Sequence, residues 1–220
     1  MNILISRRIF AATVMGMAVL LAATGGLRAG TSDDPASTSA DSALTFIQSL
    51  GDQAVEALRD NIESPFEERE AAFRKVMVSG FDIPIVGRFV LGRHWRTATK
   101  EQRREYMAIF VDFIVRVYAS RFDSYGGELF TARSVIDDES GDKIVRAQIV
   151  RPSGGDPIGI DFRVRMRDEG YKVIDVTVEG ISMLHTHRVE FASVINRKGI
   201  DGLLSDLRAR AEAPIRNAAE

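Results

Sequence analysis

Apolar residues along this chain follow two different periods, and the change from one to the other falls near Gly126. Between residues 106 and 118 they recur three and four positions apart, as they do along one face of a helix. Between residues 158 and 167 they alternate with polar residues, which is typical of a strand with one buried and one solvated face. The pattern therefore predicts helices first, an antiparallel sheet next, and helices again after residue 183.

Capping residues place the ends of these elements. Ser64, Asp82 and Thr99 each stand at an N-cap position before an apolar run, and Gly199 interrupts the last one. Thr99 and Gln102 have the spacing of a capping box, which opens a helix of roughly 23 residues, about 34 Å long. Besides this long helix we expect helices at 43–59, 65–80, 83–91, 183–196 and 200–213. We expect strands at 129–136, 143–151, 158–167 and 171–178.

These elements predict an α+β fold, in which a helical layer packs over one face of a four-stranded, curved antiparallel sheet. We expect a cone of the nuclear transport factor 2 or cystatin type. The dry face of the sheet and the broad apolar face of the long helix are the expected partners. Both carry Phe, Ile, Val and Met, so large side chains on both sides would hold the layers apart around an internal apolar pocket.

The N-terminal segment has the features of an export signal. Arg7 and Arg8 precede an uncharged run that ends near Ala29 in an A-x-A-like cleavage site. We therefore predict a signal peptide at 1–29, a flexible polar leader at 30–42, a single domain at 43–213 and a tail at 214–220. A retained membrane anchor is the alternative for the first segment. The arginine pair also resembles a twin-arginine export signal.

Composition narrows the classes of function. The chain has 29 basic and 31 acidic residues, and removing Arg7, Arg8 and Arg28 with the signal peptide leaves 26 basic residues and a formal charge of −5. This balance argues against a nucleic-acid partner. The sequence contains no cysteine, so it has neither disulfides nor a lipobox cysteine, and the exported domain must be stable through packing alone.

The sequence offers little for catalysis. His94, His185 and His187 are its only histidines, and it has no G-x-S-x-G elbow and no glycine-rich phosphate loop. We therefore predict no catalytic residue, no metal site and no cofactor, and a protein that is not an enzyme. Arg163 and Arg165 project from the polar face of the sheet, where they either face solvent or contact a lipid phosphate or an acidic partner.

Two motifs give the chain a family resemblance. The first is Leu91-Gly92 with Trp95, followed by the Thr99-to-Gln102 segment and the aromatic residues of the long helix. The second runs from Asp175 to Ser182 with the sequence DVTVEGIS, and an Arg188…Phe191 pair follows it. The chain resembles the MlaC family of periplasmic phospholipid-binding proteins, also called the toluene-tolerance family, from about residue 66 to 208. It departs from the family in having Thr186-His187 where Asn-Tyr is usual.

The resemblance implies a periplasmic carrier that holds phospholipid as cargo. Its expected partners are phospholipid, an inner-membrane ABC transporter with an MCE-domain subunit, and an outer-membrane lipoprotein complex, and its expected role is to maintain outer-membrane lipid asymmetry. The hopanoid-associated branch of the family, HpnM, is an alternative with a different lipid cargo. A small-molecule enzyme of the cone-shaped isomerase type, and an interaction module without lipid, are the alternatives from other classes.

A lipid carrier needs a dry slot, because burying each CH₂ group contributes about 0.8 kcal/mol. We therefore expect apolar residues of both walls to bind the lipid. On the long helix they are Phe110, Phe113, Ile114 and Val117; on the sheet they are Ile160, Phe162, Val164, Val176 and Val178. Plain core packing is the alternative for each of them taken singly. Trp95 either lies at the pocket rim or anchors the third helix.

Overall fold

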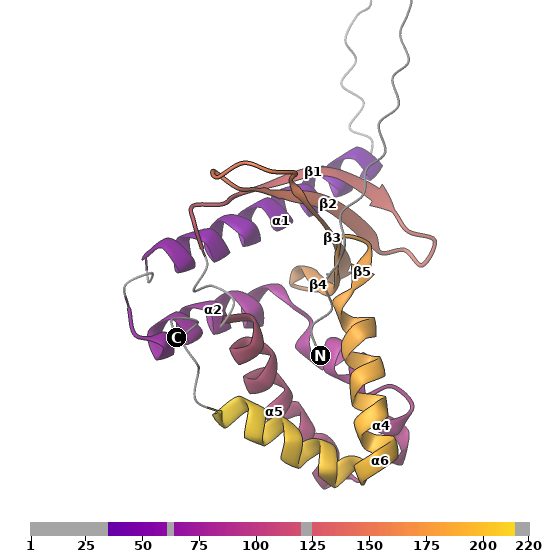
Figure 1. Ribbon diagram of the computed structural model, residues 1–220. Coiled ribbons are helices and arrows are strands. Elements are labelled where there is room, and N and C mark those ends of the chain that lie inside the picture. The colour runs from indigo at the N-terminus through magenta and orange to yellow at the C-terminus, as the bar shows by residue number, and fades with distance from the viewer. Residues whose placement is uncertain (1–34, 61–63, 120–124, 214–220) are drawn as a thin grey trace, which may run out of the picture. The chain divides into compact units, whose positions relative to one another are not determined.

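The computed structural model describes residues 35–60, 64–119 and 125–213. The predicted signal peptide and the predicted C-terminal tail lie outside these ranges. The chain forms helices and one antiparallel sheet, which confirms the α+β class (Figure 1). Within the described ranges, no helix has both the length and the apolar composition that crossing a membrane requires.

The sheet is an open antiparallel meander with the strand order β1-β2-β3-β4-β5. Its first four strands are β1 (Leu129–Asp137), β2 (Lys143–Val150), β3 (Ile158–Arg167) and β4 (Gly170–Val178), within a residue of the predicted bounds. The predicted count of four is wrong, because a short fifth strand, β5 (Ile181–Ser182), pairs with Thr177 and Val178. Two residues are too few to show an alternating pattern, so periodicity does not predict this strand.

The helices before the sheet are α1 (Pro35–Asp60), α2 (Phe66–Gly80), α3 (Ile83–Leu91), α4 (His94–Thr97) and α5 (Lys100–Ala119). The capping box of α5 is confirmed: the amide of Gln102 donates to Thr99 Oγ1 over 3.1 Å, and the amide of Thr99 donates to Gln102 Oε1 over 3.0 Å. Asp82 caps α3 by accepting from the amide of Ile85.

Two details of these helices differ from the prediction. The expected cap at Ser64 is wrong, because Pro65 is the N-cap of α2 and makes no side-chain cap bond. Instead the Pro65 carbonyl accepts from the amides of Glu68 and Arg69. The short helix α4 was not predicted either, since four residues do not complete a periodic pattern.

Helix α1 covers the apolar face of the sheet. The prediction that the long helix packs on this face is therefore wrong. Ala43 and Ile47 of α1 are fully buried in one cluster with sheet residues, and Figure 1 shows α1 lying along β1 and β2. The helix begins at Pro35, so residues 35–42 of the predicted flexible leader are helical. A hydrogen bond between the hydroxyls of Ser39 and Tyr171 holds this early part against β4.

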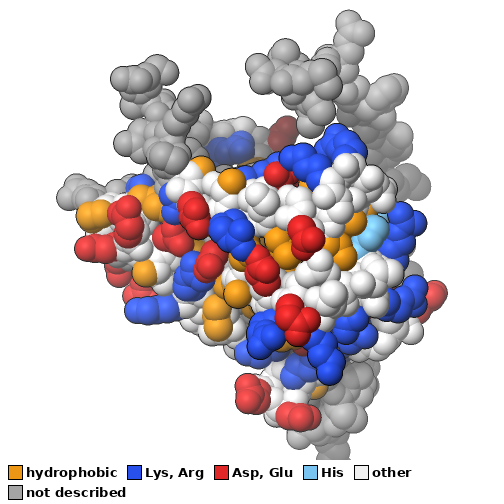
Figure 2. All heavy atoms as spheres, turned by 90° about the horizontal axis from the view of Figure 1, so that it is seen from below, with side chains coloured by type: hydrophobic (Ala, Val, Ile, Leu, Met, Phe, Trp, Pro, Cys, Tyr) orange, Lys and Arg blue, Asp and Glu red, His pale blue; other side chains and the backbone are white. Residues whose placement is uncertain are grey.

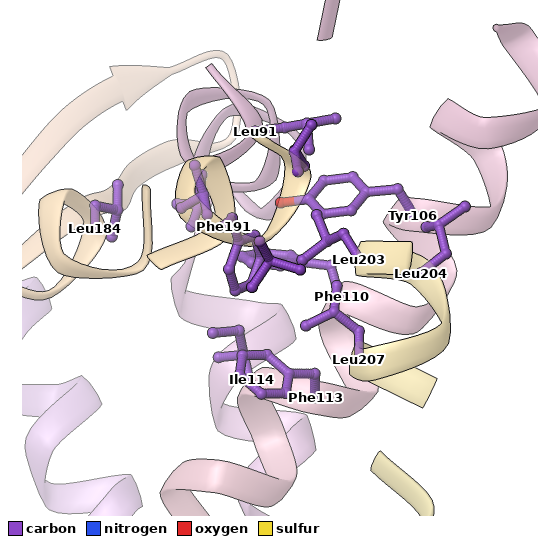
Figure 3. Close-up of a cluster of buried hydrophobic side chains, with 14 of the residues drawn as sticks. Leu91, Tyr106, Phe110, Phe113, Ile114, Leu184, Phe191, Leu203, Leu204 and Leu207 are labelled. Carbon is purple, nitrogen blue, oxygen red and sulfur yellow. The ribbon is translucent and has the colours of Figure 1, made fainter. Parts of the chain in front are cut away.

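Helices α5 and α6 (Met183–Glu212) form a second layer together with α2 and α3. The predicted break at Gly199 is confirmed, because α6 is kinked there at φ 74° and ψ 178°. Only glycine tolerates this backbone conformation readily. The kink divides α6 into two segments, and both pack against α5 (Figure 3).

Candidate functional site

The predicted wall residues of α5 lie in a core between helices. Phe110 and Phe113 are each 1 % exposed, and Ile114 is buried with them. The ring of Phe191 on α6 packs against both phenylalanines, with centroid distances of 6.4 Å to Phe110 and 5.8 Å to Phe113. Figure 3 shows these side chains converging from α5 and α6. The apolar face of α5 therefore meets α6 instead of the sheet.

We call this group the helical cluster, and its buried members come from α2, α3, α5 and α6. They are Met77, Val86, Val90, Leu91, Tyr106, Phe110, Phe113, Ile114, Val115, Leu184, Phe191, Val194, Ile195, Leu203, Leu204 and Leu207. The Tyr106 hydroxyl donates to the carbonyl of Gly87 over 3.0 Å, so its buried polar atom is satisfied. Burial raises the pKa of Tyr106 well above its usual value, which keeps the hydroxyl protonated.

Three of the five predicted wall residues of the sheet belong to a different core. Val164 is fully buried, and Phe162 and Val176 pack half-buried beside it. Ile160 is also buried, and Val178 is half-buried on the last long strand. We call the core around Val164 the sheet cluster. Its buried members are Ala43, Ile47, Leu50, Val76, Val145, Val164, Tyr171 and Val173.

Helix α2 stands where the two clusters meet. Its neighbouring residues Val76 and Met77 belong to the sheet cluster and the helical cluster, respectively. Phe81, directly after α2, packs against both clusters and forms a parallel bridge with Val173 of β4. The predicted wall residues of α5 and those of the sheet that lie in a cluster therefore belong to two separate clusters, which meet at α2 and Phe81.

Several apolar side chains at the edges of the clusters keep part of their surface exposed. On the helical side they include Phe73, Val117 and Tyr118, and on the sheet side they include Phe46, Phe130, Phe162 and Val176. Three of the nine residues predicted to bind lipid are of this kind, namely Val117, Phe162 and Val176, and Val178 is half-buried on the same strand as Val176. A ligand can touch these side chains without displacing the packed core, whereas Phe110, Phe113 and Val164 are already in full contact with protein.

Two arginines on the polar face of the sheet, Arg163 and Arg165, are neutralised within the chain. Asp142 is 2 % exposed, and its carboxylate accepts from Arg163 Nε over 2.9 Å and from Arg165 Nε over 2.6 Å. Hydrogen bonds from Arg165 are the main reason that the pKa of Asp142 is lowered to about 2. Arg163 also donates to Asp138. These arginines therefore lock the β1–β2 turn onto β3, and they contact carboxylates of their own chain.

Two histidines that are close in the sequence, His185 and His187, have different surroundings. His185 is exposed, whereas His187 packs its ring against Phe113, Tyr118 and Phe191. The Tyr118 hydroxyl lies 3.2 Å from His187 Nε2. His187 thus packs among the aromatic side chains of α5 and α6. Among the described residues, no three His, Cys, Asp or Glu side chains are grouped so as to hold a metal ion.

A surface cleft of about 510 Å³, which the sequence pattern does not predict, lies between α3, α4 and α6. Its lining is rich in arginine and aromatic residues: Ile85, Arg88, Phe89, Gly92, Arg93, Trp95, Arg96 and Arg188. Trp95 also packs against the helical cluster, so it both anchors α4 and lines this cleft. The basic run of residues 88–96 is visible in the sequence, but Arg188 joins it only through the fold.

Comparisons with known proteins agree on one family. A family model described as MlaC protein matches residues 48–209. The intermembrane phospholipid transport system binding protein MlaC of Haemophilus influenzae is 27% identical over 139 residues, which cover 61% of this chain and 64% of that protein. The match thus spans less than two thirds of that relative's length.

A solved structure has a similar fold. It is the phospholipid-binding protein of Ralstonia solanacearum in complex with a phospholipid, and it is similar with a TM-score of 0.68 at 22% sequence identity. The similarity covers 77% of this chain and 96% of that one. The sheet and the helical layer described above are therefore an arrangement that a second, distantly related chain also adopts.

Proposed function

Because this chain belongs to the MlaC family, we propose that it binds a phospholipid and carries it between membranes without catalysing a reaction. The family match over residues 48–209 is the observation that carries this proposal. The curated relative is named as a binding protein of a phospholipid transport system, and the similar structure is of a phospholipid-binding protein. Both names refer to the same class of ligand.

The acyl chain lies along the half-buried apolar side chains at the edges of the two clusters. Val117 supplies this surface on the helical side, and Phe162, Val176 and Val178 supply it on the sheet side. Moving about sixteen CH₂ groups out of water yields roughly 12 kcal/mol at about 0.8 kcal/mol each. A hydrogen bond to a head group contributes about ten times less, so apolar contact dominates the affinity.

The other five predicted residues support this surface from behind. Phe110, Phe113, Ile114, Ile160 and Val164 are each less than a tenth exposed, so they shape and stiffen the walls. A wall that keeps its shape when the lipid leaves does not have to be ordered again at the next binding event. We call Val117, Phe162, Val176 and Val178 the contact set and the other five residues the support set. Substitutions in the two sets are expected to have different effects.

The carrier works in the periplasm and exchanges its lipid with complexes in both membranes. The sequence pattern of residues 1–29, from which we predict an export signal, supports this location. The partners are an inner-membrane ABC transporter with an MCE-domain subunit and an outer-membrane lipoprotein complex, and the role is to maintain the lipid asymmetry of the outer membrane. The name of the curated relative, an intermembrane transport component, supports this role.

Lipid analysis of natively purified protein tests the proposal. The full chain is expressed in a Gram-negative host, purified from the periplasm without detergent, and examined by native mass spectrometry and by lipid extraction. We expect a bound species whose mass matches a phospholipid. A polycyclic hopanoid in its place would assign the chain to the hopanoid-associated branch. Protein that carries no lipid, and gains none from phospholipid vesicles, would refute the carrier assignment.

A further inference from the structure

The arginine-lined cleft carries an unbalanced positive charge. Arg88, Arg93, Arg96 and Arg188 all line it. Within the described part of the chain, none of these four guanidinium groups forms an ion pair with a carboxylate. Arg93 makes long hydrogen bonds of 3.4 Å to His94 and to Asn196.

Three carboxylates of α5 and α6 are held by groups outside the cleft. Glu105 of α5 pairs with Arg208, Glu190 of α6 pairs with Arg210, and Asp201 accepts from Gln102. A chain with a formal charge of −2 thus concentrates uncompensated arginines in one concave place. Clefts lined by one sign of charge focus the electric field and attract ligands of the opposite sign. Figure 2 views the molecule from below and shows many Lys and Arg side chains on this face, with Asp and Glu side chains among them.

Aromatic rings position several of these arginines. The guanidinium of Arg188 lies 4.8 Å from the ring centre of Phe89, and those of Arg88 and Arg103 lie 6.0 Å and 5.6 Å from the ring of Trp95. A guanidinium stacked on a ring keeps its N–H edges free, and these edges match a carboxylate in a bidentate geometry. Phe89 is 42 % exposed, so the cleft offers an apolar surface beside the charges.

Gly92 makes this arrangement possible. Its φ is 59°, and a Cβ atom built there would lie 3.0 Å from Nε of Arg188. A side chain at this position would strain the backbone and press on Arg188. Glycine at this point therefore brings an arginine of α6 against the end of α3, and the cleft depends on that approach.

We infer that this cleft docks an acidic segment of a partner protein, one with several carboxylates around an apolar side chain. Its concave shape and exposed aromatic ring fit side chains of a peptide better than the surface of a bilayer. Its arginines come from three helices, so they offer several separate contacts, whereas a single phosphate needs donors that converge on one point. The inference goes beyond lipid binding, because none of the cleft residues belongs to the contact set of the lipid walls.

A binding assay with a defined acidic peptide tests the inference. The probe is the fluorescein-labelled peptide Glu-Glu-Trp-Glu-Glu, with Gln-Gln-Trp-Gln-Gln as the uncharged control, titrated with the full chain and followed by fluorescence anisotropy. We expect the acidic peptide alone to bind, and its affinity to fall when the NaCl concentration is raised about tenfold. The variant Arg93→Glu/Arg188→Glu is expected to lower the affinity by about tenfold or more.

A matched variant separates the effect of losing the cleft arginines from the effect of changing the net charge of the protein. Arg133→Glu/Arg146→Glu changes the charge equally at two exposed positions of the sheet, and we expect it to bind the acidic peptide nearly as well as the parent. Equal losses in both variants would overturn the inference. So would cleft-dependent binding to vesicles containing phosphatidylglycerol, or to inorganic phosphate, with none to the peptide. Bound phospholipid is measured in every variant, and unchanged lipid content shows that a lost peptide affinity leaves the carrier function intact.

Discussion

The ring of Phe130 on β1 packs directly against the backbone of Gly51 on α1: a Cβ atom built on the glycine would lie 2.1 Å from Cδ1 of the ring. The ring fills the space that any other side chain at position 51 would need. This contact brings the backbone of α1 close to the first strand, so α1 covers the apolar face of the sheet. Helix α5 is consequently free to pack against α6.

Gly51→Ala is therefore expected to destabilise the protein, although alanine is the better helix former. The added Cβ must displace the Phe130 ring, and such overpacking costs about 1–3 kcal/mol, which exceeds the gain in helix propensity of about 1 kcal/mol. Urea unfolding followed by circular dichroism measures the difference.

A second substitution tests the cause of that loss. Gly51→Ala combined with Phe130→Leu removes part of the ring, and we expect it to recover stability relative to Gly51→Ala alone. Ser49→Ala on the same helix is the control for helix propensity. If Gly51→Ala proved as stable as the parent, the close packing of α1 on β1 would be contradicted.

Phe113 and Val117 lie one helical turn apart on α5, and they have different predicted roles. Phe113→Ala removes a ring buried against Phe191 and should cost about 3–5 kcal/mol of unfolding free energy. Val117→Ala removes a half-buried side chain and should cost much less. Phe113→Glu should unfold the protein, because it buries a charge in the helical cluster. Equal unfolding midpoints for the two alanine variants would contradict these roles.

Val178→Asp tests the contact surface for lipid. This residue is half-buried, so a carboxylate there can stay hydrated in the empty protein but must lose water when an acyl chain covers it. We expect co-purified phospholipid to fall several-fold while the unfolding midpoint changes little. Met166→Asp, on β3 at a residue that is 54 % exposed, is the matched control and should keep its lipid.

The stability contributed by Asp142 should depend on pH. The pKa of its carboxyl is lowered from 3.8 to about 2 in the folded chain, so the contribution is complete above the unfolded value and is lost as the pH falls toward 2. Asp142→Asn should therefore cost about 2 kcal/mol near neutral pH. Urea unfolding at several pH values should show the gap between parent and variant closing below about pH 4. A gap that stays constant down to pH 2 would contradict the ion-pair explanation.

Local structure was largely predictable because it depends on neighbouring residues. The alternation from Ile158 to Arg167, the capping box of Thr99 and Gln102, and the break at Gly199 each carry their signal within a few positions. The pairing of the apolar faces was not predictable in this way. Periodicity shows that a helix has an apolar face, but it does not show which surface that face meets.

The same limit applies to the candidate site. The bulk of their helical face predicts Phe110 and Phe113 as lipid-wall residues, and only the fold shows that Phe191 of α6 packs beside them. Gly51 lies inside a helical pattern, where glycine costs about 1 kcal/mol relative to alanine, and the structure gives the packing reason, its contact with Phe130. The arginine cleft draws on residues 88–96 and on Arg188, and only the fold brings them together.

Photo-crosslinking with a phospholipid that carries a diazirine on its acyl chain tests the central claim most directly. The full chain is loaded with this lipid, irradiated and digested, and the modified peptides are identified by mass spectrometry. We predict that the labels fall on the segments with Val117, Phe162, Val176 and Val178. Labels confined to the exposed polar face of the sheet or to the arginine cleft, or no label at all, would contradict acyl-chain binding between the two clusters.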